Sequence, residues 1–296
     1  MTKNKALAVL FIALVVFVNM GMRVIPAPSQ TRQIIDNMIA AIARHQGVTF
    51  TMDAAERIVG KPKEFNQMEM FTKVKINPLS IYGKVLKDPN AGTELLYVTG
   101  QHDNKIRVNP GKFLPTLTLA QTNGLLTKNQ HHTLLTSGFV IVQKIMTAGI
   151  KRAEAADPNK GFDSIFKYAG DVQYHNRNCS RIIINDPTYT YTTVVGQKGE
   201  NVLALARRLL VSEYHIMDLN PSSHSLDDDV SGKTLKVPTS YAKKTVLYID
   251  KATNFPLYQE MSDERGLFEK YEYTNLVVNP AFKADEFTEK FSEYKF

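Results

Sequence analysis

The chain has 296 residues, and 43% of them are hydrophobic, which is typical of a folded protein with a sizeable core. Its formal net charge is +7, but lysine and arginine are scattered along the chain and form no basic block interleaved with aromatic residues. This distribution argues against nucleic acid as a partner. A mildly positive protein is suited to contact with anionic lipid or cell-wall polymer.

The N-terminus carries targeting information. Two lysines precede an uncharged apolar run, residues 6–18, which is shorter than the roughly 20 residues that cross a bilayer. Small residues at 27–29 offer a cleavage point, so residues 1–29 are predicted to be a signal peptide. If the apolar run extends through Met22, these residues form an uncleaved membrane anchor instead. A cleaved signal peptide and an uncleaved anchor both predict that the protein is located in the periplasm or cell envelope of a bacterium.

Two segments after the signal have helical periodicity. In residues 31–46, apolar side chains fall on one stripe, and Gly47 follows at the position of a helix stop. In residues 137–155, apolar and small side chains recur at spacings of three and four. We expect the second helix to pack across one face of a β-sheet. The lone Cys179 is expected to be a buried free thiol, because it has no cysteine partner.

Most of the remaining chain has a sequence pattern typical of β-strands. Short runs rich in Val, Ile, Phe, Thr and Tyr are separated by turn residues, and the turns are too short to contain crossover helices. The runs occupy residues 63–76, 79–88, 93–100, 105–111, 170–186, 188–195 and 245–278, the last as three strands. Alternation over residues 68–74 predicts one face turned inward and one facing water. The fold class is therefore α+β, with an antiparallel sheet.

Between two of these strand regions lies a stretch of different character, residues 199–220. Its first part has apolar residues at helical spacing, and Ser212 is a suitable N-cap for a second short helix. With a strand on either side, the stretch reads as a small β-α-α-β domain over residues 191–240. It resembles a LysM domain over residues 190–238. The matching positions are Gly199, Ala206, Val211, Ser212, Leu219, Asn220, Gly232, Leu235, Val237 and Pro238.

The LysM resemblance implies binding of polymers that contain N-acetylglucosamine, such as peptidoglycan. In that family the groove lies between the turn before the first helix and the loop after the second. The corresponding glycan-binding residues here are Gly199, Glu200, Asn201, Asn220, Pro221 and Ser222. The alternative is a unit that has kept the fold and lost the ligand.

The host of this insertion, residues 30–190 and 241–296, has its own resemblance. Its C-terminal run is similar to the lipoprotein-carrier superfamily of LolA and LolB. The similarity rests on Ile249, Asp250, Pro256, Asp263, Gly266, Tyr271, Tyr273, Asn275, Asn279, Pro280 and Phe287. The resemblance implies a curved, incompletely closed antiparallel sheet, or half-barrel, wrapped around helices.

Such a half-barrel has an apolar concavity that takes acyl chains or a hydrophobic segment of a partner. The candidate cavity residues are Met68, Met70, Tyr82, Tyr97, Phe139 and Met146. Methionine tolerates varied apolar shapes, which suits a lipid site. The alternative is that these side chains are ordinary packed core.

The sequence carries no motif typical of catalysis or metal binding. His102, His131, His132 and His175 have no zinc-site spacing and are interpreted as solvated loop residues. The acidic run 227–229 lacks the calcium-loop pattern. No nucleophile motif is present, and the spacing does not single out any carboxylate pair, Glu264 and Glu269 included. We therefore predict no catalytic residues, no metal and no cofactor.

The sequence thus predicts a non-catalytic exported protein. Its half-barrel would bind a lipid or a lipidated partner, and its LysM module would tether it to peptidoglycan. Two alternatives remain: a cell-wall hydrolase or lipid-modifying enzyme that uses LysM for targeting, and a structural interaction protein with no small ligand.

Overall fold

A computed structural model describes residues 28–87, 89–111 and 114–296. The predicted signal peptide or anchor therefore lies outside the described residues, apart from Pro28 and Ser29. Within the described ranges, no helix has both the length and the apolar character that crossing a bilayer requires.

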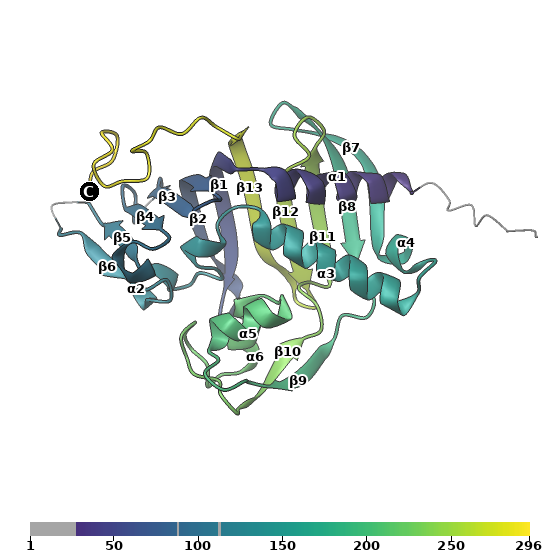
Figure 1. Ribbon diagram of the computed structural model, residues 1–296. Coiled ribbons are helices and arrows are strands. Elements are labelled where there is room, and N and C mark those ends of the chain that lie inside the picture. The colour runs from purple at the N-terminus through teal and green to yellow at the C-terminus, as the bar shows by residue number, and fades with distance from the viewer. Residues whose placement is uncertain (1–27, 88, 112–113) are drawn as a thin grey trace, which may run out of the picture.

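The described chain is dominated by one antiparallel sheet of eleven strands, in the order β6-β5-β4-β3-β2-β1-β13-β12-β11-β8-β7 (Figure 1). The sheet is curved and unclosed, because the strands at its two edges do not pair with each other. Its strands are β1 (Gly47–Ile58), β2 (Lys61–Lys75), β3 (Ser80–Val85), β4 (Glu94–Val98), β5 (Ile106–Asn109), β6 (Leu117–Leu119), β7 (Phe166–Tyr174), β8 (Arg177–Asn185), β11 (Lys244–Asp250), β12 (Pro256–Asp263) and β13 (Gly266–Val278). The predicted α+β class with a large curved antiparallel sheet is confirmed.

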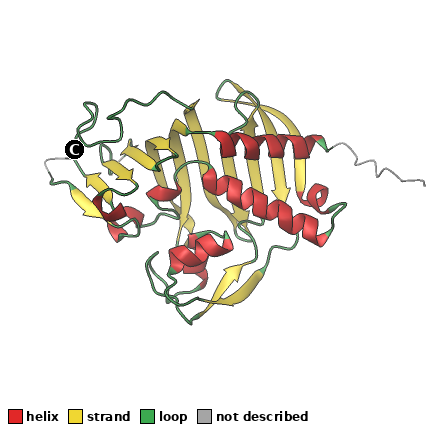
Figure 2. Ribbon diagram, viewed as in Figure 1, coloured by secondary structure: helices red, strands yellow, loops and turns green. Residues whose placement is uncertain are grey.

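Two long helices, α1 (Gln30–Arg44) and α3 (Val140–Ala156), cross the same face of this sheet (Figures 1 and 2). Helix α1 buries Ile35, Met38 and Ile42 against it, and its N-cap Ser29 accepts a hydrogen bond from the backbone of Arg32. The shorter helices are α2 (Gly124–Thr127), α4 (Gly161–Ile165), η1 (His102–Asn104) and η2 (Leu134–Thr136). Both predicted long helices are confirmed, with ends shifted by a few residues.

The central strand β1 was not among the predicted strands. In its first half, buried and partly buried residues alternate clearly. Its second half contains Ala54, Ala55 and Glu56, which are residues typical of helices. Pairing with β2 on one side and β13 on the other holds it extended over its whole length. Tertiary pairing therefore overrides local propensity here.

The expectation that one face of β2 meets water is wrong near Lys73. The ammonium of Lys73 lies 2.7 Å from a carboxylate oxygen of Glu286, and both side chains are buried. The ring of Tyr82, next to it on β3, stacks on Tyr294 at 3.7 Å between centroids. The C-terminal segment, residues 280–296, thus covers the outer face of β2 and β3, which alternation within a single strand does not predict.

A smaller unit, residues 191–238, leaves the sheet after β8 and returns before β11. It consists of β9 (Tyr191–Val195), α5 (Val202–Leu209), α6 (Glu213–Leu219) and β10 (Thr234–Pro238), and β9 pairs only with β10. Its helices and strands enclose a separate cluster of buried apolar side chains, including Val202, Leu205 and Leu235. We call residues 191–238 the inserted unit, since β8 and β11 are neighbours in the large sheet.

The inserted unit is joined to the large sheet through α6. Tyr214 is fully buried, but it belongs to the apolar core of the sheet and not to that of the unit. Its ring stacks on His131 at 4.4 Å between centroids, and Phe268 of β13 lies in nearly parallel orientation at 6.0 Å. Helix α6 therefore has one face in each core, and this junction positions the site described next.

Candidate functional site

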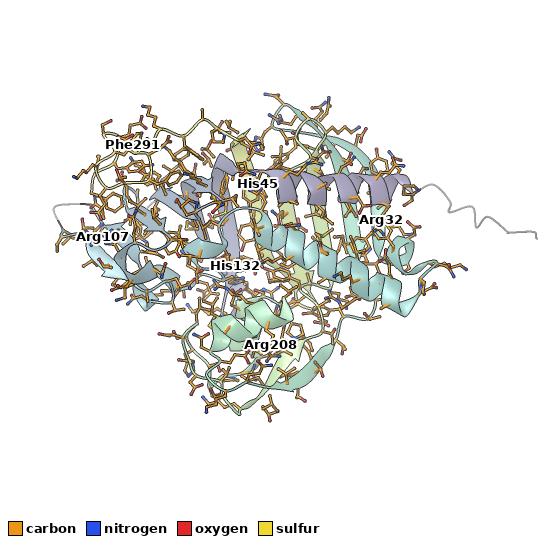
Figure 3. All side chains as sticks on the ribbon, in the orientation of Figure 1. Arg32, His45, Arg107, His132, Arg208 and Phe291 are labelled. Atoms are coloured by element: carbon orange, nitrogen blue, oxygen red, sulfur yellow. The ribbon has the colours of Figure 1, made fainter. Side chains whose placement is uncertain are left out.

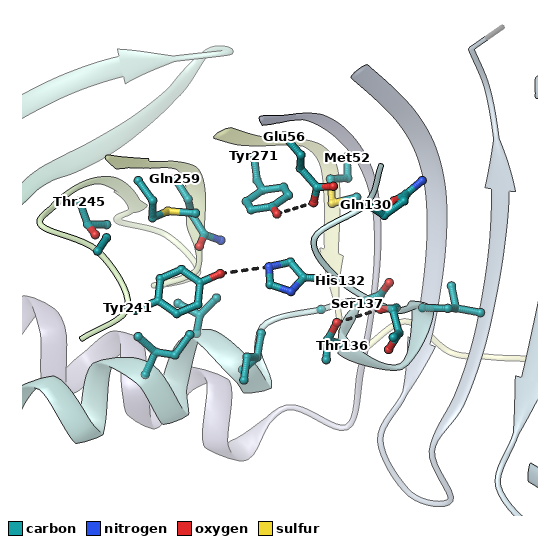
Figure 4. Close-up of a pocket in the computed structure, with 18 of the residues that line it drawn as sticks. Met52, Glu56, Gln130, His132, Thr136, Ser137, Tyr241, Thr245, Gln259 and Tyr271 are labelled. Carbon is teal, nitrogen blue, oxygen red and sulfur yellow. Dashed lines mark hydrogen bonds between the residues drawn. The ribbon is translucent and has the colours of Figure 1, made fainter. Parts of the chain in front are cut away.

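A cavity of about 430 Å³ lies between the concave face of the large sheet and helix α3 (Figure 4). Its walls are mostly apolar: strands β1, β2, β11 and β12 contribute Met52, Met68, Met70, Leu247 and Met261, and α3 contributes Ile141, Val142, Ile145 and Met146. Two lining residues, Asn90 between β3 and β4 and Leu125 of α2 (Gly124–Thr127), are exposed and mark where the cavity reaches the surface.

The structure divides the six residues expected to line a cavity into two groups. Met68, Met70 and Met146 line it, whereas Tyr82, Tyr97 and Phe139 do not. Tyr82 points to the other face of the sheet, where it stacks on Tyr294. Phe139 is fully buried and packs edge-on against Phe50. That the three methionines contact a ligand stays a prediction.

One part of the cavity wall is polar and rests on two glutamates. Glu56 of β1 and Glu269 of β13 are directly opposite each other in the antiparallel register. Their side chains are 3% and 0% exposed, so water screens neither carboxylate. Residues opposite each other on neighbouring strands lie about 5 Å apart at Cβ, and like charges in this position destabilise a sheet. A cation is therefore needed between them.

His131 meets that requirement from the loop before η2. Its backbone N–H donates to Glu56 Oε2 at 2.8 Å, and its Nδ1 lies 2.7 Å from Glu269 Oε1. Its Nε2 lies 2.6 Å from the carbonyl oxygen of Arg57. Both ring nitrogens thus face acceptors, so both must carry protons, and His131 is an imidazolium.

His132 is held in the same way. Its Nδ1 lies 3.0 Å from Glu213 Oε2, and its Nε2 lies 3.0 Å from the hydroxyl oxygen of Tyr241. Because the Tyr241 hydroxyl donates to Glu269 Oε2 at 2.6 Å, its oxygen accepts from His132. His132 is therefore a second imidazolium, at the point where the large sheet meets the inserted unit (Figure 3).

The inserted unit contributes the first turn of α6 to this network. Ser212 occupies the predicted N-cap position, but its hydroxyl makes no capping hydrogen bond. It donates instead to Glu269 Oε1 at 2.7 Å, while the next residue, Glu213, pairs with His132. The Ser212 hydroxyl therefore links the inserted unit to the sheet and does not cap α6.

A second ion cluster flanks the first. Arg57, the residue after Glu56, is 1% exposed and forms a bidentate pair with Asp263, at 2.9 and 3.1 Å. Its Nε donates to the carbonyl of Leu267 at 2.9 Å. On the same aspartate, His215 Nε2 of α6 lies 3.4 Å from Oδ2. The turn between β12 and β13 is thereby fastened to both β1 and α6.

The pKa values of the network follow from these contacts. Burial alone would lower the pKa of His131, but the bond to Glu269 and the charge of Glu56 outweigh it and raise the pKa. The same competition, with Glu213 and Glu269 as the anions, places the pKa of His132 well above its ordinary value. Burial would raise the pKa of Glu269, but His132 and His131 hold it well below its usual range.

The interpretation of His131 and His132 as solvated loop residues is wrong. His131 is 1% exposed, and the side chain of His132 is 21% exposed because it lines the cavity. The available signal was indirect: Glu56 and Glu269 each occupy an inward position of a strand whose other inward residues are apolar or aromatic. A charge at such a position requires a buried partner.

Sequence reasoning also did not identify the buried network that includes these histidines. Its other members are Glu56, Arg57, Ser212, Glu213, Tyr241, Asp263 and Tyr271, of which Ser212, Asp263 and Tyr271 were named only as an N-cap or as motif positions. Glu264, named with Glu269 as a carboxylate pair, is exposed and accepts instead from the hydroxyl of Tyr191 at 2.6 Å. Within the residues that the structure describes, no cluster of His, Cys, Asp and Glu is arranged to hold a metal ion.

Most candidate glycan residues serve the inserted unit itself. Glu200 is paired with Arg208 at 2.7 and 2.8 Å, and Asn201 caps α5 through a bond from Ala204 N–H. Asn220 ties the end of α6 to β10, donating to the carbonyl of Lys236 and accepting from its N–H. The other three, Gly199, Pro221 and Ser222, are exposed. Glycan contact by any of the six stays a prediction.

The chemistry available to the histidines is limited by their bonds. A general base needs a free lone pair near the substrate. Both nitrogens of each imidazole donate to protein acceptors, and the carboxylates accept from protein donors. The arrangement is suited to a fixed polar wall at one side of an apolar cavity.

Replacing His131 by Leu should destabilise the fold by about 3–5 kcal/mol, the cost of removing one partner from a buried ion pair. Urea denaturation followed by circular dichroism measures this loss. The exposed His224 provides a matched control, and His224→Leu should change little. Adding Glu269→Gln to His131→Leu should recover part of the loss, because it removes one of two opposed charges. Equal stability of His131→Leu and wild type would contradict the bridging role.

The free energy of unfolding should fall as the pH rises from 6 to 9. A histidine with a raised folded pKa stabilises fully below its unfolded pKa of about 6.5, and this contribution is lost as the pH passes the folded value. His131 and His132 both act in this direction. Urea titrations at several pH values test it, and His132→Gln should show a smaller fall. Stability that is flat, or that rises, over this range would refute the assignment of two imidazolium ions.

Comparison with known proteins gives structural neighbours at low identity. An uncharacterized conserved protein from Thermus thermophilus has a TM-score of 0.39 at 7% identity, covering 90% of this chain and 98% of that one. The lipoprotein LppX from Mycobacterium tuberculosis has a TM-score of 0.40 at 11% identity, covering 86% and 97%. A LolA superfamily protein from Nitrosomonas europaea has a TM-score of 0.32 at 7% identity, covering 88% and 98%. At these scores the likeness carries no conclusion about function.

No curated protein matches the chain by sequence. One family profile does, over residues 45–196, which is just over half of the chain and runs from before β1 through β9. That range contains Glu56, Arg57, His131 and His132 of the buried network, whereas Tyr241, Asp263, Glu269 and Tyr271 lie beyond it. The chain therefore belongs to the family described as "Protein of unknown function (DUF1571)".

Proposed function

We propose that this chain is a non-catalytic binding protein of the bacterial cell envelope that holds the acyl part of a lipid, or of a lipidated partner, in the cavity under α3. The cavity carries the proposal: its volume of about 430 Å³ lies within the range of about 300–1,000 Å³ found for small-molecule sites. Its walls are largely apolar, and Glu56 and His132 of the buried network form a polar wall on one side.

The methionines support a flexible apolar ligand. Met52, Met68, Met70, Met146 and Met261 all line the cavity. Unbranched thioether side chains adapt to different shapes, which suits chains of varying length or unsaturation. Burial of each methylene group of such a ligand contributes about 0.8 kcal/mol.

The inserted unit supports a second part of the proposal, attachment to peptidoglycan. Its order of strand, two helices and strand, with the two strands paired, is the architecture that the LysM resemblance implies. The loop after α6 lies against the start of α5, because Leu203 N–H donates to the carbonyl of Leu226 at 3.0 Å. Exposed Gly199 and Ser222 would then face the polymer. Lipid capture and tethering would act together in the envelope.

Val142→Trp should weaken binding of N-phenyl-1-naphthylamine, a neutral apolar fluorophore, about tenfold. Val142 lines the cavity, and a bulky indole there would displace roughly two methylene groups of ligand, at about 0.8 kcal/mol each. The chain has no tryptophan of its own, so emission from the new indole reports its surroundings. Fluorescence titration measures the affinity.

Lys144→Trp places the same residue on the exposed side of α3 and provides the control, which should bind as wild type does. No fluorescence gain with the wild-type chain would argue against an accessible apolar cavity. Equal affinity of the two tryptophan variants would show that the probe binds elsewhere.

Ser222→Trp should reduce the fraction of protein that sediments with purified peptidoglycan, because the indole would obstruct the loop after α6. Thr193→Trp, on the exposed side of β9 in the same unit, is the matched control and should sediment like wild type. Wild-type protein that stays in the supernatant would contradict tethering. Released muropeptides would favour the alternative of a cell-wall hydrolase.

A further inference from the structure

We propose that Gln259 anchors the head of the ligand by donating a hydrogen bond to a carbonyl oxygen, so that the cavity prefers a neutral acyl ester or amide to a free fatty acid. The inference rests on the proposed function and specifies its ligand. It comes from a buried donor in the cavity wall that no protein group satisfies.

Gln259 lies in the middle of β12, opposite Leu247 of β11 and Tyr271 of β13. These neighbours and Gln259 itself line the cavity, and the amide reaches toward the space that Tyr241 and His132 also border (Figure 4). The residue is 4% exposed. A polar side chain in the middle of a concave strand face, among methionines and leucines, is placed to meet a ligand.

The amide nitrogen of Gln259 has no hydrogen-bond partner among the described residues. Five other buried side-chain atoms there also lack one, on Thr72, Glu94, Tyr189, His215 and Tyr294, but none of these residues lines the cavity. Buried polar groups in folded proteins nearly always have a hydrogen-bond partner. An unpaired amide nitrogen on a residue that lines the cavity therefore indicates an acceptor that a ligand in the cavity supplies.

The charges nearby determine which acceptor fits. Around the polar wall, the carboxylates of Glu56, Glu213 and Glu269 bond to His131 and His132, and of the three only Glu56 lines the cavity. These five groups carry one negative charge in excess. The neighbouring Arg207, which donates to Thr133 Oγ1, is exposed to water that screens its charge. A ligand carboxylate placed here would be repelled, since such charges interact strongly at low dielectric.

The two other charged residues that line the cavity do not reverse this preference. Arg152 and Asp186 both line the cavity, and the charge of Asp186 acts on Arg152. The pair contributes one charge of each sign. A neutral carbonyl oxygen accepts from Gln259 without adding a charge, as in an acyl ester or an acyl amide.

Displacement of N-phenyl-1-naphthylamine at pH 7.5 by three probes that share a ten-carbon chain tests the proposal. Methyl decanoate should bind more tightly than decanoate, and Gln259→Met should weaken methyl decanoate about two- to tenfold, the effect of one neutral hydrogen bond. The same variant should leave decane binding unchanged or slightly tighter. Methionine keeps the length of glutamine, so the variant should fold. Gln143→Met, on α3 outside the cavity lining, is the matched control and should bind all three probes as wild type does.

The outcomes separate the two proposals. Wild-type protein that binds none of the probes would overturn the proposed function. Binding of decane and methyl decanoate that Gln259→Met leaves unchanged would overturn the anchor and leave the cavity as a lipid site. Decanoate that binds as tightly as its methyl ester would overturn the preference for a neutral head.

Discussion

The structure depends on one electrostatic constraint. Glu56 and Glu269 face each other on adjacent central strands, out of water, and they stay compatible because His131 lies between them as a cation. An isolated buried charge is costly, and a buried pair repays that cost only when its remaining hydrogen bonds are made. Tyr271, Tyr241 and Ser212 supply these bonds.

The same network determines how the parts are assembled. Because Ser212 and Glu213 begin α6, neutralising the glutamates also docks the inserted unit against the sheet. Because His132 and Glu56 line the cavity, the network also gives an apolar cavity its polar wall. A change at the glutamate pair would therefore affect stability, the position of the inserted unit and the ligand site together. Buried charge in this protein links the two cores through a shared set of hydrogen bonds.

Sequence periodicity predicted the helices α1 and α3, the hairpins from β2 to β5 and from β11 to β13, and the order of elements in the inserted unit, because these features follow from local pattern and turn chemistry. It failed at β1, where Ala54, Ala55 and Glu56 favour a helix locally and long-range pairing decides the outcome. It failed again at His131 and His132, because their partners are more than 70 residues away in the chain. Local rules are expected to fail where a functional site imposes other demands.

The cavity site is the claim on which the functional interpretation rests, and native mass spectrometry tests it most directly. The chain would be purified from bacterial membranes, transferred to a volatile buffer and ionised without unfolding. We expect a species heavier than the chain by the mass of one lipid, and gentle activation should release that lipid. The contradicting result is a spectrum that shows only the mass of the unliganded chain. This mass would have to be found both for the purified protein and after its incubation with vesicles of phosphatidylethanolamine and phosphatidylglycerol.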